Sequence, residues 1–343
     1  MAQRHAFISS KHRIFLPFYN PRMNTPILFR HCGLLLTCLA FSGLRAGAPP
    51  VTAQLKVSDD EITALAAAPA GTLLLVAGET LTLVDLAGGR QPKKFSGVGG
   101  GTQRAALFSA DGQRIYGASS KGMLVSGAAS GVKIERKVKA HDGEINALAL
   151  SPDGKWLASG GEDKLIKFWD AATFAAGNSP GAMPATIQSL VFSPNGGELA
   201  AAGDDGAIII FNLKTGARQT PIASGDTVNA LAWSPDGKLL ASAGNSDQIQ
   251  LWNPATGKLA HGFPRQSSWV SRLLFMPDGH RIAALSADKT LRIFRVDTGE
   301  LLEGFTAGGD DDVTALALLA DGTLVTGGRD EAVKRWVPKP TGN

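Results

Sequence analysis

The chain has 343 residues and a formal net charge of +4 at pH 7. Its excess of basic residues lies in residues 1–48, which contain no acidic residue, so the rest of the chain gives no indication of a nucleic-acid-binding surface. Both cysteines, Cys32 and Cys38, also lie there. A chain without this segment would therefore contain neither a disulfide nor a thiolate metal site.

Residues 1–48 are predicted to be a leader. The apolar run Cys32–Leu44 follows Arg30 and precedes the small residues Ala46–Ala48, which is the order of a secretory signal. The run is shorter than the roughly 20 residues that span a bilayer. We expect translation from Met23, cleavage near Ala46–Ala48, and a mature chain without a membrane span in the periplasm or outside the cell. The alternatives are an uncleaved membrane anchor and a cytoplasmic protein with a mis-annotated start.

After the leader, an apolar segment, a turn and a second apolar segment recur seven times at intervals of 41 to 43 residues. The turns are marked by Pro69, Ala110, Pro152, Pro194, Pro235, Pro277 and Ala320. A constant period in this range is typical of repeat proteins, in which each unit completes the core of its neighbour. The sequence therefore predicts one closed repeat domain over residues 49–337 and a short tail at 338–343.

Within the third repeat, the pattern predicts a four-stranded antiparallel sheet. Glu144–Leu150 and Lys155–Ser159 flank the turn Ser151–Gly154, Leu165–Trp169 alternates as a third strand should, and Ala171–Pro184 has room for a fourth. One sheet of this size cannot bury both of its faces, so we expect the sheets to stack radially.

The segment SPDGKWLASGGEDKLIKFWD (Ser151 to Asp170) resembles the signature of WD-repeat proteins. The resemblance implies an all-β fold, a seven-bladed β-propeller of four-stranded antiparallel blades, and we interpret the chain as a bacterial exported member. The last repeat ends at Trp336 without an outer strand. Because an N-terminal strand commonly completes the last blade in this family, we predict that Val51–Val57 pairs beside Val333–Trp336 and removes an open sheet edge.

His141, Ser159, Asp163 and Trp169 contain the residue types of a catalytic set, but the resemblance assigns them another role. In WD-repeat blades these positions form a hydrogen-bonded structural tetrad, which pairs polar groups that would otherwise be buried alone. We therefore predict no catalytic residue and no cofactor. We also predict no metal, because His141, His261 and His280 lack ligand spacing, and Asp310–Asp312 is interpreted as a solvated loop.

The resemblance also implies which residues face a partner. Three positions of each repeat lie around the channel on the narrower face of such propellers, where partners commonly dock. The candidate partner-binding residues are Arg104, Glu144, Asn146, Gln188, Asn229, Trp269, Asp312 and Arg329. Trp269, Arg104 and Arg329 come first, because Trp and Arg are enriched among interface hot spots.

We therefore expect a non-enzymatic, exported and monomeric scaffold that binds a protein partner through this face. The alternative is an extracytoplasmic propeller enzyme of the lactonase or dehydrogenase type, with its site at the channel mouth, because fold alone does not exclude catalysis.

Overall fold

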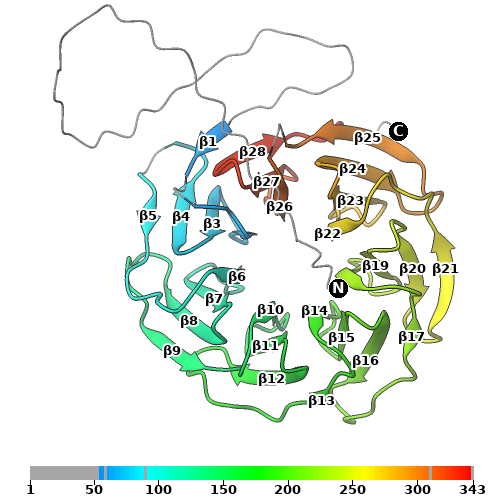
Figure 1. The fold of residues 1–343 in the computed structure, drawn as a ribbon, viewed down its shortest axis with the longest axis horizontal. Helices are drawn as coiled ribbons and strands as arrows, with labels where there is room; N and C mark the ends of the chain where they lie inside the picture. The colour runs from blue at the N-terminus through cyan, green and yellow to red at the C-terminus, as the bar shows by residue number, and fades with distance from the viewer. Residues whose placement is uncertain (1–53, 58–59, 89–90, 309–310, 341–343) are drawn as a thin grey trace, which may run out of the picture. The chain divides into compact units, whose positions relative to one another are not determined.

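The computed structural model describes residues 54–57, 60–88, 91–308 and 311–340. Its strands form seven four-stranded antiparallel sheets, which are arranged as blades around a common axis (Figure 1). The predicted all-β, seven-bladed propeller is confirmed. The predicted leader at residues 1–48 lies outside the described residues.

We number the blades 1 to 7 in chain order and name their strands first to fourth from the axis outward. Blade 1 contains β2 (Ala64–Ala67), β3 (Leu73–Ala77), β4 (Leu81–Asp85) and β5 (Lys93–Lys94); blade 2 contains β6 (Gln103–Phe108), β7 (Arg114–Ser119), β8 (Met123–Ala128) and β9 (Arg136–Lys139); blade 3 contains β10 (Ile145–Leu150), β11 (Trp156–Gly161), β12 (Leu165–Asp170) and β13 (Gly181–Ala182); blade 4 contains β14 (Ile187–Phe192), β15 (Glu198–Gly203), β16 (Ala207–Asn212) and β17 (Ile222–Ala223).

The remaining blades follow the same order. Blade 5 contains β18 (Val228–Trp233), β19 (Leu240–Gly244), β20 (Gln250–Asn253) and β21 (Lys258–Gly262); blade 6 contains β22 (Val270–Phe275), β23 (Arg281–Ser286), β24 (Thr290–Arg295) and β25 (Leu301–Thr306); blade 7 contains β26 (Val313–Leu318), β27 (Leu324–Gly328) and β28 (Ala332–Trp336), with β1 (Gln54–Lys56) as its fourth strand.

The first two strands of a blade are joined by the turn that marks each repeat. In blade 3 the hydroxyl of Ser151 donates to Asp153 (2.6 Å) and accepts the backbone N–H of Trp156 (2.9 Å). Gly154 has φ +72°, a left-handed conformation that glycine adopts without a steric cost. The Ser-Pro-Asp-Gly sequence, which recurs unchanged in blade 5 and with variants such as Ser-Pro-Asn-Gly in blade 4, is therefore a local hydrogen-bonded turn.

The hydrophobic core is divided among the interfaces between blades. Seven clusters of buried apolar side chains occur in the described residues, and each contains residues of two neighbouring blades. The second strands are buried on both sides; Leu199, Ala200, Ala201 and Ala202 of β15 are fully inaccessible. Each blade therefore depends on its two neighbours, as the repeat period predicted.

The ring closes through β1. In the antiparallel register, Leu55 faces Val333, with Gln54 opposite Lys334 and Lys56 opposite Ala332. Val57 is buried in the cluster between blades 7 and 1. The predicted closure is confirmed for residues 54–56, whereas residues 51–53 lie outside the described part of the chain.

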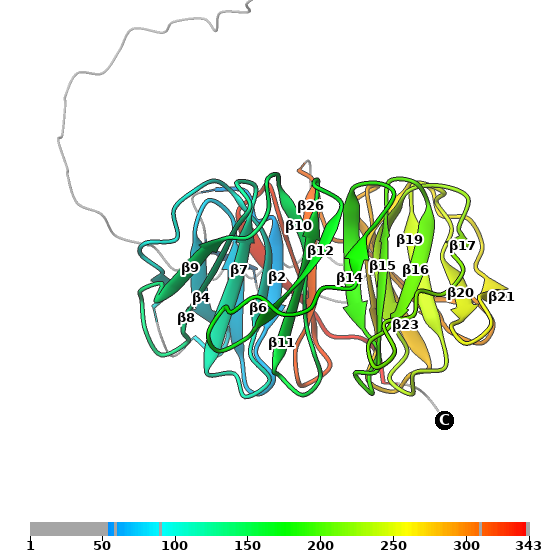
Figure 2. The same ribbon diagram turned by 90° about the horizontal axis from the view of Figure 1, so that it is seen from below.

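Successive connections in an antiparallel meander lie at opposite ends of the sheet, so the loops gather at two ends of the propeller (Figure 2). We call the top face the end with the turns between second and third strands and the connections into each first strand. The bottom face carries the other two kinds of turn. The tail runs beside blade 6, where Lys339 N–H donates to Glu303 (2.9 Å).

We predict that Leu55→Asp lowers the stability by about 1–3 kcal/mol, because it places a carboxylate where β1 packs on blade 7. Gln54→Asp, at the exposed neighbouring position, is the control and should melt like the wild type. The measurement is thermal and urea unfolding of the three proteins. Equal unfolding midpoints would show that β1 contributes nothing to closure.

Candidate functional site

Six of the seven first strands contain a β-bulge near the top face. In β6, β10, β14, β18, β22 and β26 the register against the second strand shifts by one residue, which leaves one residue unpaired. The bulged residues are Arg104, Asn146, Gln188, Asn229, Ser271 and Thr314. A bulge re-aims a side chain. Four of the candidate partner-binding residues, Arg104, Asn146, Gln188 and Asn229, are therefore the bulged residues of their blades.

A glycine on the second strand accommodates the bulge in four blades. A Cβ atom added to Gly161 would lie 1.8 Å from the backbone oxygen of Glu144, and one added to Gly203 would lie equally close to that of Thr186. Gly244 and Gly328 meet the same obstacle at 1.9 and 2.0 Å. No side chain fits at these distances, so glycine is required at the end of these four second strands. In blades 2 and 6 the bulge is present with Ser119 and Ser286 in the same register.

Several bulged side chains link a blade to the next one. Asn146 Nδ2 donates to the carbonyl oxygen of Ile187 (3.2 Å), and Asn229 Nδ2 lies 3.5 Å from that of Val270. The hydroxyl of Thr314 bonds the carbonyl oxygen of Ile62 in blade 1. These amides and hydroxyls join neighbouring first strands. Asn146 and Asn229, predicted as partner-binding residues, therefore already bond within the scaffold.

The charged candidates are brought together in pairs rather than in one cluster. Arg104 Nε lies 3.3 Å from a carboxylate oxygen of Glu144 on the next blade. Arg329 lies 3.1 Å from Asp312 within blade 7 and 3.4 Å from Glu61 of blade 1. These pairs are exposed, and exposed ion pairs contribute little to stability. Their side chains can exchange these contacts for contacts with a partner.

Two other candidates behave differently. Gln188 Nε2 donates to Asp204 (2.9 Å), which keeps its amide within blade 4. Trp269 enters β22 at the top face with 46% of its surface exposed. Its indole N–H has no hydrogen bond within the described residues, while its backbone oxygen accepts the N–H of Ala287 (2.9 Å). Its backbone is therefore tied to the blade and its side chain is free to bind.

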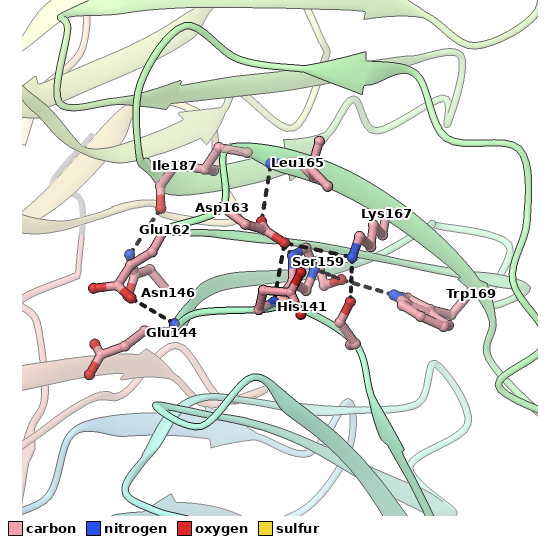
Figure 3. Close-up of polar contacts among 12 residues, drawn as sticks. His141, Glu144, Asn146, Ser159, Glu162, Asp163, Leu165, Lys167, Trp169 and Ile187 are labelled. Carbon is pink, nitrogen blue, oxygen red and sulfur yellow. Dashed lines mark hydrogen bonds and ion pairs between the residues drawn. The ribbon is translucent and has the colours of Figure 1, made fainter.

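The tetrad residues of blade 3 form one continuous chain of hydrogen bonds (Figure 3). Trp169 Nε1 donates to Ser159 Oγ (2.9 Å), Ser159 Oγ lies 2.7 Å from His141 Nε2, and His141 Nδ1 lies 2.8 Å from Asp163 Oδ1. A neutral His141 with its proton on Nδ1 satisfies every member. Ser159 is fully buried, so no substrate reaches its hydroxyl.

The environment favours that neutral histidine. Burial lowers the pKa of His141 below its usual value, although the hydrogen bond and the charge of Asp163 act in the opposite direction. Burial raises the pKa of Asp163, but hydrogen bonds from His141 and the backbone N–H of Leu165 outweigh it and keep the pKa low. A charged Asp163 beside a neutral His141 is the resulting state.

Sequence reasoning missed a basic residue that completes this arrangement. Lys167 Nζ lies 3.6 Å from Asp163 and donates to the backbone oxygen of Ala140 (2.6 Å). The same spacing of four residues from a turn aspartate recurs in Asp288 with Arg292 (2.7 Å) and in Asp330 with Lys334 (2.6 Å). That repeated acid-to-base spacing is the signal that could have revealed it.

The Trp to hydroxyl contact of the tetrad also recurs around the ring. Trp252 donates to Ser242 (2.8 Å) in blade 5, and Trp336 donates to Thr326 (2.9 Å) in blade 7.

Within the part of the chain that the structure describes, no three His, Cys, Asp or Glu side chains gather as a metal site would require.

These features define a class: a seven-bladed β-propeller whose blades are stabilised by hydrogen bonds of buried polar side chains. The family model for the IFT122 first beta-propeller matches residues 103–342, more than half of the chain. The chain therefore belongs to the family of WD40-type β-propellers. Such propellers typically act as protein-interaction scaffolds and are generally not enzymes.

Individual relatives match only short segments. The chain is similar to WD repeat-containing protein 3 of Mus musculus, with 38% identity over 60 residues, which are 18% of this chain and 6% of that protein. Its homolog in Dictyostelium discoideum is 49% identical over 39 residues, 11% of this chain and 4% of that protein. Small ribosomal subunit protein RACK1y of Oryza sativa subsp. japonica is 47% identical over 38 residues, 11% of each chain.

These matches therefore cover about a tenth or less of each relative, and the activities and partners of those proteins are not transferred to this chain. The three relatives are eukaryotic, so they give no support to the bacterial exported type that the sequence suggested.

We predict that Asp163→Ala destabilises the protein by about 1–3 kcal/mol, because it leaves His141 and Lys167 without their carboxylate. Asp205→Ala, at the turn aspartate of blade 4, is a control, since that carboxylate bonds only a backbone N–H two residues on. Thermal and urea unfolding measure both. An unchanged midpoint for Asp163→Ala would contradict the structural role of the tetrad.

The lowered pKa of His141 also predicts a pH dependence. As the pH falls, His141 takes up a proton near pH 6.5 in the unfolded chain and only at lower pH in the folded chain. The contribution of neutral His141 to the stability is therefore complete above pH 6.5 and is lost as the pH falls toward the lower folded pKa. We expect the wild-type melting temperature to fall between pH 7.5 and 5. His141→Gln, which does not titrate, should fall less; parallel curves for the two proteins would contradict this assignment.

Proposed function

We propose that this protein is a scaffold that binds a protein partner through the top face of its propeller. The observation that carries the proposal is Trp269, an exposed indole with a free donor on a backbone tied to blade 6. A large apolar side chain exposed on a rigid rim is typical of an interface anchor. Little ordering entropy is lost when such a surface binds.

The charged residues beside the rim add specificity. Arg104 and Arg329 each lie across a blade boundary from an acid, and these exposed pairs can be exchanged. Most other charges in the top loops are acidic. The exposed ones include Glu79, Asp142, Glu162, Asp204 and Asp226. A partner with a basic surface that places acidic groups opposite Arg104 and Arg329 is therefore favoured, because opposite charges accelerate association and fix the orientation.

We further propose, from the sequence of residues 1–48, that the chain is exported. The leader lies outside the described residues, and among those that are described no helix combines the length and apolarity needed to cross a bilayer. The mass of the mature protein isolated from its natural host tests export. Loss of about the first 48 residues supports it, and an intact N-terminus would favour the cytoplasmic or anchored alternative.

We expect Trp269→Ala combined with Arg104→Glu to abolish partner capture without changing the melting temperature, because both side chains are exposed and neither lies in an interblade cluster. The measurement is crosslinking and mass spectrometry of affinity-captured complexes. Leu301→Ala, which removes an exposed side chain on the outer strand of blade 6, is the matched control.

A specific partner that binds both the wild type and the double variant equally would overturn the proposed face. Purification of the wild type with a bound small molecule and a measurable turnover would instead favour the enzyme alternative.

A further inference from the structure

A groove lies on the bottom face, between blades 3 and 4, away from the residues proposed above. Its volume is about 530 Å³, within the usual size of ligand sites, and it is open to solvent. Its walls are the turns after β10 and β14 and the connections after β12 and β16. Trp156, Phe168, Phe192 and Leu213 give it an apolar floor.

Trp156 is held as a rigid platform in this groove. It keeps 39% of its surface exposed, although it begins a buried strand. A Cβ atom at Gly177 would lie 2.5 Å from its ring, so the indole rests directly on that backbone. Gly177 N–H in turn donates to the backbone oxygen of Phe168 (2.8 Å). The ring is thus supported from one side and available from the other.

The polar groups of the groove are only partly used. Asp153 Oδ1 accepts the hydroxyl of Ser151, while its other oxygen has only Lys155 at 3.8 Å. Asn195 Oδ1 accepts the hydroxyl of Ser193, and its Nδ2 has no partner within the described residues. Lys214 is exposed and makes no ion pair among the described residues. Blade 3 therefore offers a carboxylate, and blade 4 offers hydrogen-bond donors and a positive charge.

We propose that this groove binds an extended, proline-containing segment of another protein, with a basic residue beside Asp153 and an acidic residue beside Lys214. Proline-rich segments dock in aromatic-lined grooves as preformed polyproline II helices. Their carbonyl groups have no internal hydrogen bonds, and the free Asn195 Nδ2 is a donor suited to them. The opposite charges on the two blades complement a segment with opposite charges at its ends.

This second site does not rest on the top-face proposal. A partner on each face would let the propeller bring two proteins together. The exposed indoles of Trp156 on the bottom face and Trp269 on the top face would be the two anchors.

The test uses two labelled peptides, Arg-Pro-Pro-Pro-Pro-Glu and its reverse order, in fluorescence polarisation with the full chain. We expect saturable binding of one order, and a loss of affinity of about tenfold or more with Trp156→Ala. Lys214→Glu, a change of an exposed side chain, should weaken binding of the same peptide, and Trp269→Ala at the opposite face should leave its affinity unchanged.

The controls separate folding and charge from recognition. Thermal melts exclude unfolding of Trp156→Ala, and a peptide with the same terminal charges but a Gly-Ser centre tests simple ion pairing. Equal binding of that peptide, no saturable binding of either proline peptide, or unchanged affinity after both Trp156→Ala and Lys214→Glu would each overturn the proposal. Failure to capture a partner at the top face would not count against the proposal for this groove.

Discussion

The arrangement of the top face depends on a steric constraint, the β-bulge at the start of the first strand of each of blades 2 to 7. In blade 3 the backbone oxygen of Glu144, just before this bulge, lies so close to Gly161 that no side chain fits between them. The same bulge aims Asn146 at the carbonyl of Ile187 in the next blade. One local irregularity therefore presents a polar residue at the top face and links neighbouring blades.

The polar side chains consequently divide into two groups. Asn146, Asn229 and the tetrad around His141 are committed to hydrogen bonds within the scaffold. Trp269 and the exposed pair of Arg104 with Glu144 remain able to contact another molecule. Because the first group makes the rim rigid, the second group is held in place in the free protein, and this is the preorganisation that the proposed scaffold function requires.

Much of the fold was predictable because its cause is local and repeated. The Ser-Pro-Asp-Gly turns mark the period, and the missing outer strand of the last repeat indicated the closure by β1. The bulges were not predicted, since the sequence shows only a polar residue near the start of each first strand, and the register shift exists only after the strands pair. The groove at Trp156 was missed for the same reason, because its walls come from two repeats and its support is a glycine 21 positions away.

The sequence by itself determined the number of blades and their strand order, because these follow from hydrophobic periodicity and turn chemistry along the chain, and its resemblance to WD-repeat proteins indicated the tetrad. Only the tertiary structure decided which polar groups are already bonded and which are free. That distinction depends on distances between blades, such as Arg104 to Glu144 or Arg329 to Glu61, and those distances are set by packing rather than by position in the sequence.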